Sequence, residues 1–218
     1  MNFRPSVFCY ESDAWIFDLD GTLVDSHHAI KKHLVDVFED FGLPPYSEIE
    51  TRKLLGSSLE KIIANLGVFG EIKEQVISEF RIRLNNSLAE SHPIFPGAIL
   101  LLGNLKKKGA KIAVATNKPT EIAERVVSET QLGSYVDVVI GSTDNPPKPD
   151  PYILIKCIEL LDSRRPLMVG DSEEDRIAAV ELGIGFVGIN SSNSFSKRIA
   201  TDREAYFKSI NEILKSLF

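Results

Sequence analysis

The chain lacks several features that mark other classes of protein. Its two cysteines, Cys9 and Cys157, lie far apart and form neither a disulfide framework nor a Cys-x-x-Cys site. No run of about eighteen apolar residues occurs, and the apolar run near the N-terminus is too short for a secretory signal. We therefore expect a soluble, cytoplasmic protein with reduced thiols and no membrane partner.

An excess of positive charge is also absent. The sequence has 25 Lys and Arg against 31 Asp and Glu, a net charge of −6, and a pI of about 5.3. A surface of this kind does not attract nucleic acid or anionic membranes, so we expect a small-molecule partner. The composition, 43% hydrophobic and 26% charged, is ordinary for a globular protein, and 218 residues suffice for one domain or two. Nothing in the sequence indicates an oligomeric state.

What the sequence does have is a distinctive stretch at residues 14–25, AWIFDLDGTLVD. An apolar run ends in two carboxylates at alternate positions, Asp18 and Asp20, followed by Gly21 and Thr22. Residues two apart on an extended chain point the same way, and glycine lets backbone N–H groups approach an anion closely. Such a pair of acids suits metal-assisted chemistry on phosphate. The simpler alternative is a turn, since Asp and Gly are favoured turn residues.

Residues 26–92 carry only helical periodicity. Ser26 can cap a first helix that stops at Gly42, Gly67 ends a second helix, and a longer third helix follows. The apolar positions that define them are Ile30, Leu34, Val37, Phe38 and Phe41, then Leu59, Ile62, Ile63 and Leu66, and then Ile72, Val76, Phe80, Leu84 and Leu88. We interpret this segment as a helical cap inserted after the first strand.

From Pro96 onward apolar strands alternate with helices. We expect helices over residues 98–107, 119–130, 151–161 and about 173–182, and strands over 111–116, 137–140, 167–170 and 184–189. A last helix opens with Thr201 and Glu204 at capping-box spacing. Near-continuous apolar strands alternating with helices predict an α/β fold, a Rossmann-like parallel sheet covered on both sides. The core then comprises residues 1–25 and roughly 93–218, and residues 26–92 form the cap domain.

Polar residues follow three of these strands. In open parallel sheets the ligand crevice lies outside the carboxyl ends of the strands, so these residues converge on one edge. They are Thr116-Asn117, Lys148-Pro149-Asp150-Pro151 and Gly170-Asp171-Ser172, with Asp175 one turn further on. Taken singly, Lys148 is readily explained as a solvated loop lysine, and the two later acids as helix N-terminal residues favoured by the helix dipole.

Together with Asp18-Leu19-Asp20-Gly21-Thr22, this set resembles the four ordered motifs of the haloacid dehalogenase superfamily. The resemblance covers the whole chain, including a helical cap between the first and second motifs. The segments FDLDGTLVDS, TNKP and VGDS are most similar to the phosphoglycolate phosphatase and beta-phosphoglucomutase members of this superfamily. The resemblance implies a Mg²⁺-dependent phosphatase that hydrolyses a small phosphorylated metabolite.

The residues suit that chemistry. Asp18 would attack phosphorus to form an aspartyl phosphate, while Asp20 would protonate the leaving oxygen and then activate water. We expect neighbouring carboxylates and phosphate to raise the pKa of Asp20 so that it keeps its proton. The resemblance implies that Lys148, the Thr116 hydroxyl and the Asn117 backbone N–H bind the phosphoryl oxygens. The expected metal ligands are the carboxylates of Asp18 and Asp171 and the backbone carbonyl of Asp20, with Asp175 nearby. Ligands that are all oxygen atoms point to Mg²⁺.

Two other functions are considered. A phosphomutase needs the same pair of aspartates, but its relatives usually carry an arginine where Leu59 stands, which disfavours this alternative. A non-catalytic binding protein on an inherited fold would be expected to have lost one of the key acids or Lys148, and none is lost.

Gly56 and Ser57 are the expected contacts to the leaving group, although Ser57 can equally be a simple helix cap at capping-box spacing from Glu60.

Two further patterns carry less weight. Gly183, Gly185 and Gly188 match the dinucleotide fingerprint, but they leave a helix and enter a strand, which is the reverse of the required order. The histidines show no metal-ligand spacing, and surface or cap-core positions are expected for them: His27, His28, His33 and His92.

Overall fold

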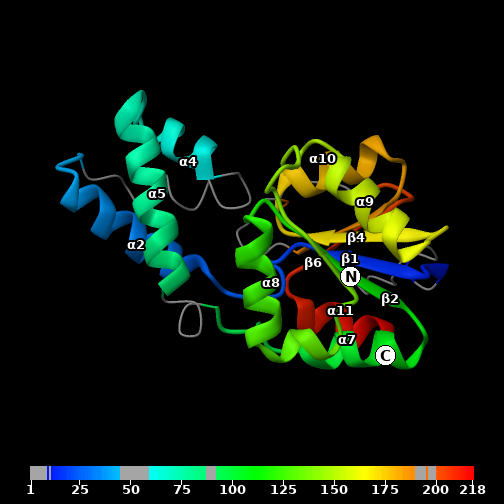
Figure 1. Cartoon of the computed structure of the whole chain (residues 1–218). Coiled ribbons are helices and arrows are strands. Elements are labelled where there is room, and N and C mark those ends of the chain that lie inside the picture. Colours follow the sequence, from blue (N-terminus) through cyan, green and yellow to red (C-terminus); the bar gives the residue numbers. More distant parts are fainter. Residues whose placement is uncertain (1–8, 10, 45–58, 87–91, 190–194, 196–199) are drawn as a thin grey trace.

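The computed structural model describes residues 9, 11–44, 59–86, 92–189, 195 and 200–218, and it contains one parallel six-stranded sheet (Figure 1). The strand order is β3-β2-β1-β4-β5-β6. The strands are β1 (Ala14–Phe17), β2 (Lys111–Ala115), β3 (Val138–Ile140), β4 (Pro166–Gly170), β5 (Gly185–Ile189) and β6 (Glu204–Phe207). The predicted α/β fold with a parallel sheet is confirmed.

Helices cover both faces of the sheet, as the apolar strands predict. Figure 1 shows α9 (Tyr152–Leu161) and α10 (Glu173–Glu181) above the sheet, and α7 (Ala98–Lys107) and α11 (Ile210–Leu217) below it. α8 (Thr120–Glu129) and the short 3-10 helix η1 (Gln131–Ser134) also join the lower side. In β1, Trp15 and Phe17 pack on this lower side, while Ile16 packs under α9 and α10. All four residues of β1 are therefore buried, and the strand runs through the centre of the molecule.

The C-terminal segment differs from the single helix expected from Thr201. The chain instead forms β6, which pairs in parallel with β5, and only then α11. Ala205 and Phe207, two residues apart, are buried on one face of the sheet, which is strand periodicity. α11 is capped by Ser209, whose side chain accepts a hydrogen bond from the backbone N–H of Glu212 at 3.3 Å. The Ser/Thr-x-x-Glu pattern thus occurs twice in this segment, at Thr201 and at Ser209. Because residues 204–207 pair with β5 as a strand, the helix begins after the second pattern.

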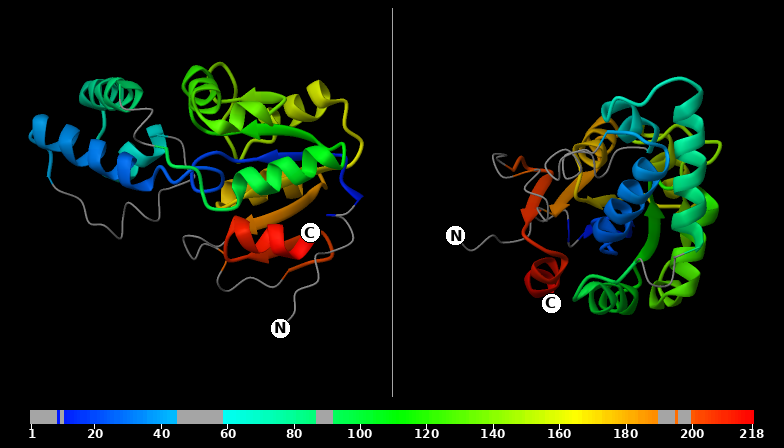
Figure 2. Two further views of the ribbon diagram at one scale, coloured as in Figure 1. Left: turned by 90° about the horizontal axis from the view of Figure 1, so that it is seen from below. Right: turned by 90° about the vertical axis from the view of Figure 1, so that its left-hand side faces the viewer.

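Between β1 and α7 the described residues form three helices, which we call the helical insertion: α2 (His27–Asp40), α4 (Leu59–Asn65) and α5 (Glu71–Asn86). The left view of Figure 2 shows it standing to one side of the sheet. Gly42 and Gly67 follow the ends of α2 and α4 with positive φ, as expected of glycine after a helix. The insertion buries its own apolar cluster: Leu34, Val37, Phe38, Ile62, Ile63, Val68, Val76, Ile77, Phe80 and Leu84.

One detail of the helical insertion differs from expectation. Ser26 occupies the N-cap position of α2, but its side chain makes no capping hydrogen bond, and its backbone is helical rather than extended.

Within the described ranges, no helix has both the length and the apolar character that crossing a bilayer requires.

Candidate active site

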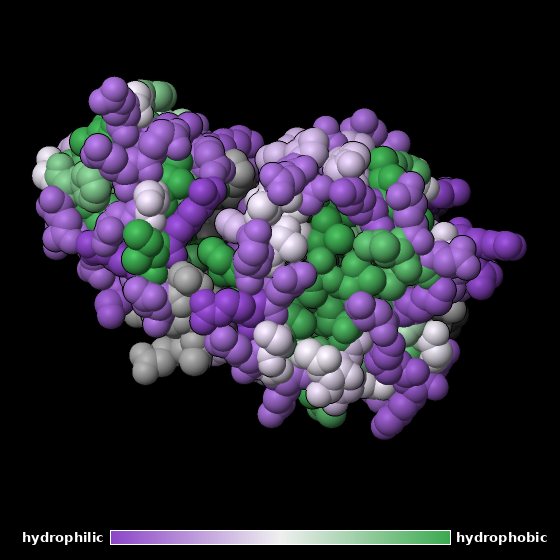
Figure 3. Space-filling view, viewed as in Figure 1, coloured by the Kyte–Doolittle hydropathy of each residue, from purple (hydrophilic) through white to green (hydrophobic). Residues whose placement is uncertain are grey.

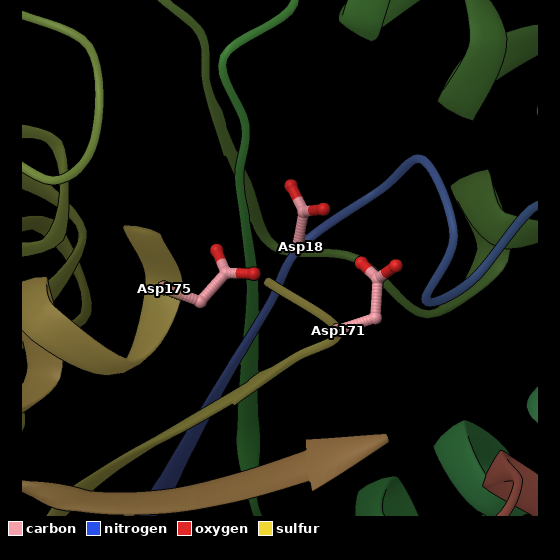
Figure 4. Close-up of side chains that lie close together, drawn as sticks. All are labelled: Asp18, Asp171 and Asp175. Carbon is pink, nitrogen blue, oxygen red and sulfur yellow. The ribbon is translucent and has the colours of Figure 1, made fainter. Parts of the chain in front are cut away.

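Three buried carboxylates meet at the carboxyl ends of the central strands. Asp18 follows β1, Asp171 follows β4, and Asp175 lies in the first turn of α10. β1 lies between β2 and β4 in register, so the residues that follow these strands emerge side by side. Each acid offers an oxygen within 4.8 Å of the others, and Figure 4 shows the carboxylates facing a common centre. We call this set the acid cluster.

Lys148 neutralises part of the acid cluster. Its Nζ donates to Asp18 Oδ1 at 2.8 Å, to Asp175 Oδ1 at 2.5 Å and to the backbone carbonyl of Ala115 at 2.7 Å. An ammonium group has three N–H bonds, so this buried lysine has a partner for each. Burial alone lowers the pKa of Lys148, but the charges of Asp175 and Asp18 outweigh it and hold that pKa above its ordinary value. Lys148 is therefore a fixed cation.

The loop that carries Lys148 is held by Asn117. The side-chain amide of Asn117 donates to the carbonyl of Lys148 at 3.0 Å and accepts from its N–H at 2.7 Å. Ser142 in turn donates to the Asn117 carbonyl at 2.9 Å. The neighbouring Thr116 is buried, and its hydroxyl oxygen accepts a hydrogen bond from the N–H of Lys118. The sequence predicted a backbone contact to phosphate from Asn117 and did not predict this role of its side chain.

Two glycines let the backbone approach the acid cluster. A Cβ atom on Gly170 would lie 2.3 Å from Asp175 Oδ2, and one on Gly21 would lie 2.4 Å from Asp171 Oδ2. Asp175 is fixed further by Ser172, whose hydroxyl donates to Asp175 Oδ2 at 2.6 Å and accepts from the Asp175 N–H at 3.2 Å. The backbone N–H of Ser172 also donates to Asp175 Oδ2 at 3.1 Å. This bond and the one from the Asp175 N–H to the Ser172 hydroxyl form the capping box of α10, which explains why both residues are buried although polar.

The acid cluster carries more negative than positive charge. Three carboxylates face one ammonium group, which leaves an excess of two negative charges when all are ionised. Burial raises the pKa of Asp18 to about 7, with Lys148 opposing and Asp175 adding to the rise. Burial and the charges of Asp18 and Asp175 also raise the pKa of Asp171 well above its ordinary value. The cluster is therefore short of a cation.

The open oxygens of the cluster fit a metal ion. Both oxygens of Asp175 have protein donors, and Asp18 Oδ1 contacts Lys148. Thr22 donates to Asp171 Oδ1 at 3.3 Å. Among the described residues, no donor contacts the Oδ2 atoms of Asp18 and Asp171. Two open carboxylate oxygens beside an excess of two negative charges suit a hard divalent cation such as Mg²⁺.

Asp20 lies outside the acid cluster and has other partners. Lys118 Nζ contacts its Oδ2 at 2.8 Å and its Oδ1 at 3.1 Å, and His92 Nε2 lies 3.9 Å from Oδ1. Burial raises the pKa of Asp20, but the charges of Lys118 and His92 outweigh this and hold it below its ordinary value. The expectation that neighbouring carboxylates raise this pKa is wrong, because the nearest charged groups are cations.

Lys118 and His92 are thus two site residues that sequence reasoning missed. Lys118 comes directly after the Thr-Asn pair at the end of β2, so its position along the chain was a usable signal. His92 is buried beside Asp20, whereas a surface or cap-core position was expected. It follows the helical insertion, far from Asp20 in sequence, so no local pattern indicated the contact.

A pocket lies between the helical insertion and the sheet edge, next to Asp18 and Asp20. The space-filling view shows the two parts as separate lobes with a hollow between them (Figure 3). On the sheet side, the pocket is lined by the site residues that follow β1 and β2, together with Pro119 and Ile122. On the insertion side the lining residues are Ile30, Leu59, Ile62, Phe80, Arg81 and Leu84. Gly56 and Ser57, the expected contacts to the leaving group, lie outside the described residues.

Comparison with known proteins identifies the class to which this fold and site belong. The sequence matches the model of the haloacid dehalogenase-like hydrolase family over residues 15–189. The chain therefore belongs to the haloacid dehalogenase-like hydrolases, and the predicted membership is confirmed.

Several curated relatives carry a more specific name. Phosphoglycolate phosphatase from Aquifex aeolicus is 30% identical over 187 residues, covering 81% of this chain and 87% of the relative. The enzyme of the same name from Rhodobacter capsulatus is 31% identical over 181 residues, covering 80% and 82%. Phosphoglycolate phosphatase 1 from Pseudomonas aeruginosa is 29% identical over 198 residues, covering 86% and 72%.

Solved structures share the fold across nearly the whole chain. A haloacid dehalogenase-like family hydrolase from Streptococcus pneumoniae superimposes with a TM-score of 0.81 at 21% identity, covering 94% of this chain and 98% of its own. Protein tyrosine kinase A from Mycobacterium tuberculosis superimposes with a TM-score of 0.80 at 24% identity, covering 94% and 98%. Proteins with such different names share this fold, so the activity must be argued from the site.

Proposed function

We propose that this hydrolase is a Mg²⁺-dependent phosphatase that acts on a small phosphate monoester through an aspartyl phosphate on Asp18. The observation that carries the proposal is the separation of two aspartates at the end of one strand. Asp18 lies in the acid cluster beside Lys148, while Asp20 lies outside the cluster beside Lys118, and both line the pocket. Two carboxylates in different electrostatic environments are suited to two different roles.

In the first step, a carboxylate oxygen of Asp18 forms a bond to phosphorus. The bond from phosphorus to the ester oxygen breaks, and its electron pair passes to the leaving oxygen, which takes a proton from Asp20. Because Lys118 and His92 favour an ionised Asp20, this proton has to be taken up together with the substrate. In the second step, Asp20 removes a proton from water, which attacks phosphorus and releases phosphate and free Asp18.

Charge on the phosphoryl group also has to be neutralised. Lys148 supplies a fixed cation, and we assign the Thr116 hydroxyl and the Asn117 backbone N–H as donors to the phosphoryl oxygens. A Mg²⁺ ion held by Asp18 and Asp171 would favour the ionised form of both acids and offset the phosphoryl charge. Asp175 supports this arrangement by fixing Lys148. The backbone carbonyl of Asp20 stays a predicted third ligand.

We further propose that residues 26–92 act as a cap domain over a core made of residues 1–25 and 93–218. The helical insertion buries an apolar cluster of its own, and it lines the pocket opposite Asp18 and Asp20. Lys61 on α4 also contacts Glu174 on α10 at 3.0 Å. An insertion in this position can exclude water from the aspartyl phosphate and contact the leaving group.

The phosphoglycolate phosphatases named above support a small phosphorylated metabolite as the substrate. A phosphomutase is less favoured. Leu59 lines the pocket as the first residue of α4, at the position where the resemblance leads us to expect an arginine in mutases.

The proposal is tested with Asp18→Asn, which is nearly isosteric but cannot form the acyl phosphate. We expect phosphate release from 2-phosphoglycolate with Mg²⁺ to fall at least about 1000-fold, because the covalent route is lost. Asp202→Asn, the same change at an exposed residue, is the matched control and should match the wild type. Asp18→Asn protein that keeps a tenth of the wild-type rate would rule out the covalent mechanism.

A further inference from the structure

Two buried lysines reach the site, and each serves a different acid. Lys148 contacts Asp18, the proposed nucleophile, and Lys118 contacts Asp20, the proposed proton donor to the leaving oxygen. A group beside Asp18 is therefore close to the phosphoryl group, whereas a group beside Asp20 is close to the leaving group. Lys118 places a positive charge on the leaving-group side of the site, where the hydrolysis of a monoester does not by itself require one.

Lys118 also has hydrogen-bonding capacity to spare. The three N–H bonds of Lys148 all have protein acceptors, one of them a backbone carbonyl. Within the part of the chain that the structure describes, Nζ of Lys118 contacts only the carboxylate of Asp20. The Lys118 side chain is 4% exposed and that of Asp20 is 19% exposed, so the pair is largely removed from water yet open on the acid side. The Lys118 ammonium group thus has an N–H bond left to donate to a ligand in the pocket.

Among the described residues that line the pocket, no other cation is comparable. Arg81 lines it from α5, but its guanidinium contacts Glu60 at 2.6 Å, and both side chains are close to half exposed. Water and the ion pair weaken the field of such an arginine. His92 is not among the described residues that line the pocket. The other described residues that line the pocket from the insertion are apolar, so they offer little competition for an anion.

We infer that Lys118 binds a second anionic group, carried by the leaving group of the substrate, and thereby selects phosphate monoesters of small hydroxy acids. The inference rests on the proposed phosphatase function and assigns its substrate class. An anion that shares Lys118 with Asp20 must lie close to the ester oxygen that Asp20 protonates. The expected substrates therefore carry a carboxylate one or two carbons from that oxygen. A sugar phosphate offers a neutral hydroxyl there and would leave the Lys118 donor without a charged partner.

The test compares two substrates that differ only at the group expected to contact Lys118. 2-Phosphoglycolate carries a carboxylate where 2-hydroxyethyl phosphate carries a neutral CH₂OH group. The quantity measured is the ratio of kcat/KM for the charged ester to kcat/KM for the neutral one, with Mg²⁺ present. In Lys118→Met we expect this ratio to fall at least about 30-fold, because a buried charge-assisted contact is lost. Lys118→Arg should recover part of the ratio, and Lys107→Met, at an exposed lysine on α7, should leave it unchanged.

A lysine that merely positions Asp20 gives a different result. Lys118→Met would then slow both substrates by the same factor, and an unchanged ratio would overturn the inference. Binding is measured separately, by calorimetry of both esters with Asp18→Asn and with Asp18→Asn combined with Lys118→Met. A preference for 2-phosphoglycolate that disappears with Lys118 supports the inference even if the wild type releases no phosphate. If the wild type releases no phosphate, only the proposed function is refuted. If both variants bind 2-phosphoglycolate with the same affinity, the role of Lys118 is refuted.

Discussion

The substitution Gly170→Ala tests how tightly the acid cluster is built. Gly170 ends β4, and its backbone does not require glycine, so the effect of an added Cβ is steric. That Cβ would lie 2.3 Å from Asp175 Oδ2 and 2.4 Å from its Cγ, at least about 1 Å closer than ordinary contact. The carboxylate cannot retreat easily, because it is held by Lys148 at 2.5 Å and by the Ser172 hydroxyl at 2.6 Å. Either the backbone shifts or the buried ion pair lengthens.

The expected cost follows from these contacts. Overpacking costs about 1–3 kcal/mol, and breaking a buried ion pair costs about 3–5 kcal/mol, so partial displacement should cost roughly 3 kcal/mol. For a chain of this size, that lowers Tm by roughly 6–12 °C. Phosphatase activity should fall as well, because Asp175 fixes Lys148.

Thermal unfolding followed by circular dichroism measures this change, with Gly103→Ala as the matched control. Gly103 lies within α7, where a Cβ would meet the Tyr135 ring at 3.4 Å, an ordinary contact. Alanine favours a helix over glycine by about 1 kcal/mol, so the control should be as stable as the wild type or more so. A Gly170→Ala protein with wild-type Tm and activity would refute the reasoning.

Three further predictions follow from the same site. Exhaustive chelation should abolish phosphate release and Mg²⁺ should restore it, whereas Asp171→Ala should raise the Mg²⁺ concentration needed at least about tenfold; full activity after chelation would contradict the metal assignment. Between pH 4 and pH 7 the metal-free protein should lose stability in urea unfolding as the pH rises, since the folded pKa of Asp18 is about 7 and its unfolded pKa about 4. Asp18→Asn should flatten that loss, and an identical pH profile would argue against the raised pKa. Lys61→Ala should change Tm by less than about 3 °C, because Lys61 is 55% exposed in its pair with Glu174; a larger drop would show that this contact holds the insertion in place.

The sequence by itself indicated the sheet and most of the residues that surround its active edge. Fully apolar runs such as residues 14–17 bury on both faces, and parallel strands bring their carboxyl ends to one edge, so Asp18, Thr116 and Asp171 were expected to converge. Helix bounds were also readable where periodicity and glycine agreed, as in α7 over residues 98–107. These features are local, because each depends on a period or a turn residue within about a dozen positions.

Tertiary structure alone decided β6, since Ala205 and Phe207 become a strand only when β5 offers a partner. It also decided the direction in which the pKa of each acid is shifted. Lys118 and His92 reach Asp20 from other parts of the chain, while burial and Asp175 act on Asp18. A pKa depends on burial and on charges across space, and neither is encoded in spacing along the chain. The sequence therefore determined which acids stand at the site, and the fold determined in which direction the pKa of each is shifted.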